Sequence, residues 1–227
     1  MPRKPRFYLP GIPVHIVQRG HSRQPVFFKD VDYFAYLDWL KEAAERYRVE
    51  IHAYVLMTNH IHLLATPRDE DGVTRMMQYL GRYYVPYINR TYGSSGSLWE
   101  GRYKASLIQG EEHLLNCMRY IELNPVRADI VRSSSHYRWS SYRCNGQGKQ
   151  DSLITQHFLY RALGKNSEEQ LQAYKALFLG QEDQDELKEI RAAWQTGTPL
   201  GNEFFIAEIE QKLKRKVGQA RRGRPSL

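Results

Sequence analysis

The order of strand-like and helix-like segments in the first half of the chain constrains the fold most strongly. Apolar or alternating runs typical of strands, and amphipathic patterns typical of helices, follow one another over residues 11–20, 30–49, 49–57, 60–66, 72–93 and 103–110. They give strand, helix, strand, strand, helix, strand, which is the order of the ferredoxin-like split βαβ fold. We therefore predict an α+β fold with an antiparallel sheet.

The remainder of the chain is helical in pattern and basic at its end. The polar stretch NGQGKQ, residues 145–150, is typical of a boundary between two folded parts. Beyond it, several amphipathic patterns predict an α-helical C-terminal extension, and the closing residues are rich in Arg, Gly and Pro. We therefore predict one domain over residues 1–145 and a helical extension over residues 151–227 that contacts nucleic acid or a partner.

Composition narrows the kind of partner and the compartment. The chain of 227 residues has a formal net charge of +8, which suits a polyanion such as nucleic acid. Its two cysteines, Cys117 and Cys144, have no CxxC spacing, which favours a reducing compartment. No apolar run approaches the ~18 residues of a membrane span, and no signal peptide is evident. We expect a cytoplasmic protein without a membrane partner.

Two imidazoles interrupt an apolar strand in the segment MTNHIHLLAT, residues 57–66. Side chains alternate between the faces of a strand, so His60 and His62 project from one face while Ile61 and Leu63 project from the other. Two histidines ~6.6 Å apart along a strand can share one divalent metal ion. The simpler alternative is a solvent-facing strand that happens to carry histidines, and two ligands alone do not complete a metal site.

A polar stripe follows on the helix-like segment EEHLLNCMRYIELNPVRADIV, residues 111–131. Tyr120 and Asn124 are four residues apart, the spacing at which side chains meet on a helix. Asn124 precedes Pro125, which disfavours helical geometry there and lets Asn124 cap a new turn instead. Both roles are compatible, because a helix that ends at Asn124 keeps the amide near Tyr120.

Several segments spread over residues 7–145 together resemble one family of transposases. These segments are VQRGHSRQPVF, NHIHLL, LWEGRYKASLI, RYIELNPVRA and WSSY. Their combination is similar to the single-tyrosine transposases of the HUH superfamily. It most resembles the REP-associated tyrosine transposases and their insertion-sequence relatives.

The resemblance implies a metal-dependent single-stranded DNA transposase that cuts and rejoins DNA at hairpin-flanked sites. It places His60 and His62 as paired metal ligands, Asn124 as a third, amide ligand, and Tyr120 as the nucleophile of a 5′-phosphotyrosine intermediate. The implied cofactor is Mg²⁺ or Mn²⁺, and the implied location is the bacterial cytoplasm, in association with the nucleoid. The alternatives are a non-catalytic DNA-binding regulator derived from such an enzyme and a metal-dependent hydrolase that forms no protein adduct.

Basic side chains are the expected contacts to DNA phosphates. We expect such contacts from Arg19, Arg102, Lys104, Arg127, Lys214, Arg215, Lys216, Arg221 and Arg222. For the residues near the end of the chain the alternative is a solvated basic tail. The resemblance to REP-associated members favours a monomer over a dimer.

Overall fold

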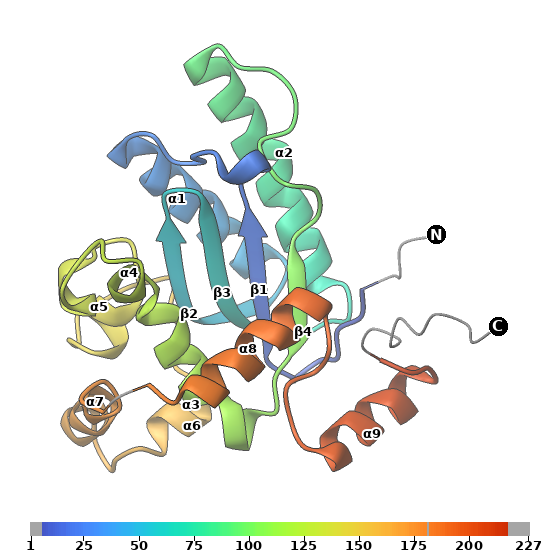
Figure 1. Ribbon diagram of the computed structural model, residues 1–227, viewed down its shortest axis with the longest axis vertical. Helices are drawn as coiled ribbons and strands as arrows, with labels where there is room; N and C mark the ends of the chain where they lie inside the picture. Colours follow the sequence, from blue (N-terminus) through green and yellow to red (C-terminus); the bar gives the residue numbers. More distant parts are fainter. Residues whose placement is uncertain (1–5, 181, 218–227) are drawn as a thin grey trace.

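The computed structural model describes residues 6–180 and 182–217 and contains the predicted α+β fold (Figure 1). Within these residues four strands form one sheet, with bounds β1 Val14–Arg19, β2 Val49–Met57, β3 His60–Pro67 and β4 Lys104–Leu107. Their order is β2-β3-β1-β4, and every neighbouring pair is antiparallel. Helix α1 (Asp30–Arg46) connects β1 to β2, and α2 (Gly72–Tyr92) connects β3 to β4. This is the predicted ferredoxin-like arrangement.

The sheet has an apolar face and a face that carries polar groups. On the apolar face Ile16, Ile61 and Leu63 are completely buried beneath α1 and α2. The second face is covered by α3 (Gly110–Glu122) and α8 (Gln184–Thr196), which lie in front of the sheet in Figure 1. Burial of apolar surface contributes about 25 cal/mol per Å², so this face contributes to the stability of the fold.

The elements that remain are mostly short. They are α4 Asn124–Arg127, α5 Tyr142–Asn145, α6 Phe158–Arg161, α7 Ser167–Ala176 and α9 Glu203–Leu213, with 3-10 turns at His21–Arg23 and Ser134–His136. None of the described helices is long and apolar enough to cross a membrane.

The C-terminal extension packs directly against the α+β domain. Its predicted start follows α5, but Ile154 bridges to Ile51 of β2, and Leu200 bridges to Ile108 just after β4. Buried apolar residues of both parts form one continuous core. The extension is therefore an integral part of the described fold.

A buried carboxylate ties the extension to the end of α3. Glu122 is completely buried and accepts hydrogen bonds from Ser141 Oγ (2.5 Å), Asn145 Nδ2 (2.9 Å) and the Tyr174 hydroxyl (2.8 Å). Burial raises the pKa of Glu122 to about 7, and the three donors offset part of the desolvation cost. Since Tyr120 lies two residues earlier, this cluster fixes the end of the helix that carries it.

Replacing Tyr174 with Phe should destabilise the protein, because a buried carboxyl oxygen then loses its donor. We expect Tyr174→Phe to lower the free energy of unfolding by about 1–3 kcal/mol, measured by urea denaturation. The control is Tyr83→Phe, at a side chain that is 43% exposed, where the change should stay within about 0.5 kcal/mol. Equal effects for the two variants would contradict a structural role for the Glu122 cluster.

Candidate active site

The register of β1 against β3 gathers the polar side chains of the second face. Arg19 lies opposite His60 and Val17 opposite His62. Directly opposite residues share a face, so His60 and His62 project together, as predicted. A third imidazole, His15, hydrogen-bonds to His62, and the sequence analysis missed it. The alternation of His15, Val17 and Arg19 signals a common face, but only the strand register brings His15 to His62.

His60 and His62 lie side by side, and on each ring Nδ1 is the nitrogen that makes a hydrogen bond. Their ring centroids are 5.2 Å apart. Nδ1 of His60 lies 2.7 Å from Asn59 Oδ1, and Nδ1 of His62 lies 2.8 Å from His15 Nε2. Within the described residues neither Nε2 makes a hydrogen bond. Both Nε2 atoms are therefore left for a ligand, with their rings oriented by neighbours as in many metal sites.

Burial keeps these imidazoles neutral at neutral pH. It lowers the pKa of His60 to about 4, an effect that the nearby Arg19 increases, and it lowers the pKa of His62 well below its ordinary value. Burial also lowers the pKa of His15 to about 3. Because the neutral ring is the metal-binding form, the pair is competent to bind a metal ion.

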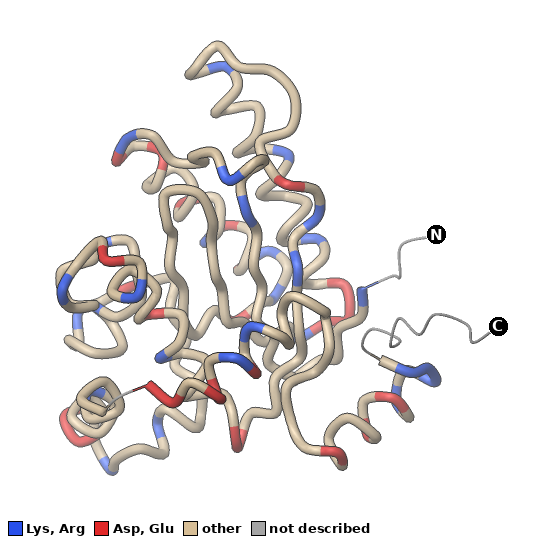
Figure 2. The backbone as a smooth tube through the Cα atoms, viewed as in Figure 1, with Lys and Arg blue, Asp and Glu red and all other residues tan. Residues whose placement is uncertain are grey.

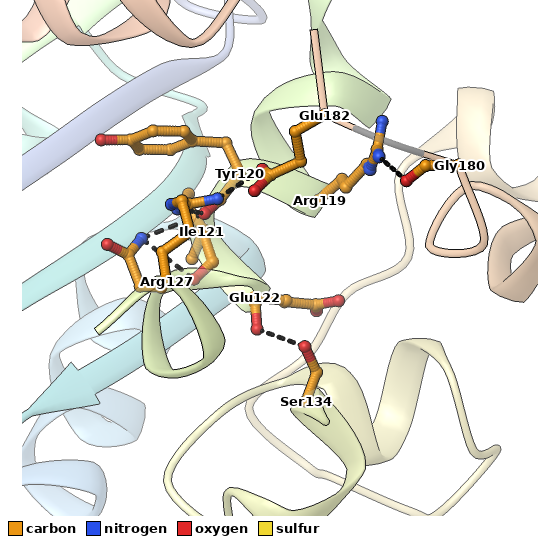
Figure 3. A network of polar contacts seen from close by, with 9 residues as sticks. Arg119, Tyr120, Ile121, Glu122, Arg127, Ser134, Gly180 and Glu182 are labelled. Carbon is orange, nitrogen blue, oxygen red and sulfur yellow. Dashed lines mark hydrogen bonds and ion pairs between the residues drawn. The ribbon is translucent and has the colours of Figure 1, made fainter. Parts of the chain in front are cut away.

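Tyr120 reaches the same face from α3. Its ring centroid is 5.9 Å from that of His62 and 5.8 Å from that of His15. The residue is 4% exposed, and Figure 3 shows its ring projecting from α3 toward the sheet. The predicted nucleophile and the predicted metal ligands therefore lie together, on one side of the sheet.

Asn124 lies where α3 gives way to α4. Its Nδ2 donates hydrogen bonds to the backbone carbonyls of Tyr120 (3.0 Å) and Ile121 (3.2 Å). The predicted proximity of this amide to Tyr120 is thus confirmed, although its partner there is the backbone. These bonds engage Nδ2 and leave Oδ1, the atom that a metal ion would use. A role for Asn124 as a ligand stays a prediction.

An ion pair holds Arg127 against Tyr120. The Arg127 guanidinium lies 2.5 Å from Glu182 Oε1, donates to the Tyr120 carbonyl oxygen and stacks 4.4 Å from the centroid of the Tyr120 ring (Figure 3). The two charged side chains are only 16% and 19% exposed. The guanidinium thus orients Tyr120 in this structure, and the phosphate contact predicted for Arg127 stays a prediction.

Helix α8 brings a tryptophan to the histidines, which the sequence analysis did not foresee. The Trp194 ring lies edge-on to His62, with centroids 5.9 Å apart, and Lys104 Nζ is 5.6 Å from the centroid of the indole. Trp194 is far from His62 in the sequence, so no local pattern could have indicated the contact. The extension therefore contributes directly to the wall of the site.

A basic cavity of about 630 Å³ adjoins Trp194 on the β4 side. Its cationic lining residues are Arg6, Arg102, Lys104, Arg215 and Lys216, whereas Glu100 is the acidic residue among the described lining. Figure 2 shows basic residues on β4, at the first described residues and after α9.

The predicted phosphate contacts thus fall into separate groups. Arg102, Lys104, Arg215 and Lys216 converge on this cavity, while Arg19 stands beside His60. Lys214 ends α9 in a left-handed conformation and does not line the cavity. The contacts predicted for Arg221 and Arg222 lie outside the described residues.

The two available imidazole nitrogens can serve a divalent cation that keeps open coordination positions. Within residues 6–180 and 182–217 no group of three or more His, Cys, Asp or Glu side chains could hold a metal ion. Two neutral imidazoles with one amide oxygen would leave positions for phosphate oxygens and water. The two imidazoles therefore fit part of a metal site, and the remaining ligands, Asn124 among them, stay a prediction.

Comparison with known proteins agrees with this architecture. The model of the family "Transposase IS200 like" matches residues 9–124, about half of the chain. The match spans the sheet, both connecting helices and the helix that carries Tyr120. The chain belongs to the IS200-like transposase family.

The chain is also similar to proteins of the REP-associated type. A protein of Haemophilus influenzae assigned as a REP-associated tyrosine transposase is 27% identical over 112 residues, which cover 45% of this chain and 64% of that protein. The match thus spans less than two thirds of that relative. A solved REP-associated tyrosine transposase bound to a REP hairpin aligns with a TM-score of 0.55 and 18% identity, over 69% of this chain and 93% of that one. The structural likeness supports the fold.

The ion pair beside Tyr120 should matter more for stability than an exposed pair of similar length. We expect Arg127→Gln to lower the free energy of unfolding by about 1–3 kcal/mol, because Glu182 and the Tyr120 carbonyl lose a largely buried partner. The matched control is Arg75→Gln, whose pair with Asp71 is 2.6 Å long but 60% and 52% exposed; there we expect less than about 0.5 kcal/mol. Thermal melts of both variants make the comparison, and similar losses would contradict the assignment.

Proposed function

We propose that this protein is a metal-dependent transposase that cleaves and rejoins single-stranded DNA through a 5′-phosphotyrosine intermediate. The supporting observation is the placement of the Tyr120 ring 5.9 Å from the His62 ring, on the face that also carries His60. Membership of the IS200-like family supports the same reaction.

Tyr120 supplies the nucleophile. Its phenol oxygen attacks the scissile phosphorus, the bond from phosphorus to the 3′ oxygen breaks, and the products are a 5′-phosphotyrosine and a free 3′-hydroxyl. No water is consumed, so the energy of the phosphodiester is retained for rejoining, which distinguishes strand transfer from hydrolysis. The phenol loses its proton as it attacks, so that proton must pass to a base or to water.

His60, His62 and Asn124 are the residues that would hold the metal ion. A bound Mg²⁺ or Mn²⁺ supplies charge neutralisation at a phosphate oxygen and helps to orient the phosphorus for in-line displacement. Arg127 holds the phenol ring in place, and the buried face excludes bulk water from the reacting groups. The protein's own contribution is thus orientation of the nucleophile and of the ligand nitrogens.

We assign the single strand that flanks the hairpin to the basic cavity beside β4. Arg102 and Lys104 come from the α+β domain, and Arg215 and Lys216 come from the extension. Cationic side chains among aromatic ones are typical of single-strand binding. Trp194 lines this cavity and also packs against His62, so a strand in the cavity would lead toward Tyr120. We propose a monomer as the active species.

The decisive experiment is formation of a covalent adduct. The wild-type protein, incubated with a hairpin-flanked single-stranded oligonucleotide and Mn²⁺, should give a protein–DNA adduct on a denaturing gel, and chelation by EDTA should abolish it. Tyr120→Phe should form no adduct, whereas Tyr83→Phe should form the wild-type amount. Adduct formation by the Tyr120→Phe variant would refute the assignment of Tyr120 as the nucleophile. Tight DNA binding by the wild-type protein without cleavage would favour a regulator. Release of a 5′-phosphate without an adduct would favour a hydrolase.

The cavity should contribute electrostatic binding. We expect the double variant Arg102→Ala, Lys104→Ala to weaken binding of the single-stranded flank and to make its salt dependence shallower, by about one unit of slope for each phosphate that is no longer neutralised. Fluorescence anisotropy over a salt series measures both quantities. The control variant Arg48→Ala, Arg75→Ala removes the same charge outside the cavity, and an equal decrease of slope there would argue against the assigned path.

A further inference from the structure

His15 is a buried histidine that the proposed chemistry does not use. It stands in the middle of β1, is 0% exposed, and places Nε2 at 2.8 Å from Nδ1 of the candidate ligand His62. The two rings are stacked, with centroids 5.1 Å apart. A neutral imidazole carries a single N–H, so only one proton can lie between these two nitrogens.

The position of that proton decides whether His62 can bind a metal ion. If His15 Nε2 donates, Nδ1 of His62 is the acceptor, and the proton of the His62 ring must sit on Nε2, which blocks that nitrogen as a ligand. If His62 Nδ1–H donates to His15 Nε2, Nε2 of His62 presents its lone pair. In the second arrangement the single proton of His15 resides on Nδ1.

A candidate partner for that Nδ1–H stands on the neighbouring strand. Ser106 of β4 lies directly opposite His15 in the sheet and is 2% exposed. Within the described residues both His15 Nδ1 and Ser106 Oγ are buried without a hydrogen-bond partner. A buried unpaired donor or acceptor destabilises the folded state, and these two atoms are complementary, since a hydroxyl oxygen accepts from an imidazole N–H.

We propose that His15, supported by Ser106, is a positioning residue that holds His62 in its metal-binding tautomer. In this arrangement the N–H at Nδ1 of His62 donates to Nε2 of His15. The N–H at Nδ1 of His15 is assigned to Oγ of Ser106, which requires a side-chain adjustment because neither atom has a partner in the described part of the structure. Asn59 Oδ1 does the same for His60, because a carbonyl oxygen can only accept from Nδ1–H. The inference rests on the proposed metal-dependent function and adds to it the residues that orient one ligand.

The test is metal affinity, measured without DNA and without turnover. Titration of Mn²⁺, with the free ion followed by electron paramagnetic resonance, gives a Kd for the wild-type protein and for each variant. We expect His15→Phe, which keeps a ring but loses the acceptor, to weaken Kd by about 10- to 100-fold. His15→Gln, whose Oε1 can accept from His62, should restore affinity to within a few-fold of wild type, and Ser106→Ala should lie between.

Two controls separate orientation from folding and from adventitious binding. The exposed His136 is replaced in His136→Phe, which should leave Kd unchanged. Binding of the hairpin oligonucleotide in EDTA, which needs the fold but not the metal ion, should be equal for wild type and His15→Phe. Unchanged Mn²⁺ affinity in His15→Phe would overturn the role of His15, whereas a wild-type protein that binds no Mn²⁺ would overturn the proposed function itself.

The protonated nitrogen of each histidine can also be measured in the wild-type protein, which tests the proposal even if His15→Phe fails to fold. Long-range ¹H–¹⁵N correlation spectra report which nitrogen of each histidine is protonated. In the Mg²⁺-loaded protein we expect His15 to carry its proton on Nδ1 and His62 to carry its proton on Nδ1. A proton on Nε2 of His15 in that state would overturn the proposal.

Discussion

The antiparallel register between β1 and β3 is the constraint on which the rest of the structure depends. Side chains alternate along a strand, so a slip by one residue would exchange the two faces of the sheet. The register is held by the apolar set Ile16, Ile61 and Leu63, which is buried beneath α1 and α2. Because that set must face inward, His60 and His62 necessarily face the other side, toward α3.

Covering the second face changes the chemistry of the residues on it. An exposed pair of histidines would be hydrated and partly protonated near pH ~6.5. Beneath α3 and α8 the rings are desolvated, and their pKa values fall, so they are neutral. The extension is therefore part of the site as well as part of the core, because its Trp194 packs against His62.

The helix that carries Tyr120 is anchored at its end by two ionisable side chains. Glu122 gathers donors from α5, α7 and the segment before α5, and Arg127 joins the Tyr120 ring to Glu182. Both groups are largely or completely buried and hydrogen-bonded, as burial of ionisable side chains requires. The phenol consequently lies beside the imidazoles through contacts made by three separate parts of the chain.

Much of the fold was determined by local sequence alone. The alternation around His60 and His62 and the helical spacing of Tyr120 and Asn124 are local patterns, so the strands, helices and shared faces could be predicted without coordinates. The family resemblance then supplied roles for those residues. The sequence also indicated basic character near the end of the chain, but not that Arg102 and Arg215 would line the same cavity.

Tertiary structure alone decided which distant residues complete the site. Nothing in the sequence pairs His15 with His62, Arg127 with Glu182, or Trp194 with His62. Those contacts depend on strand order and on where the extension docks, and both follow from minimising exposed apolar area over the whole chain. A local pattern can state which way a side chain points, whereas only the packed chain determines what it meets.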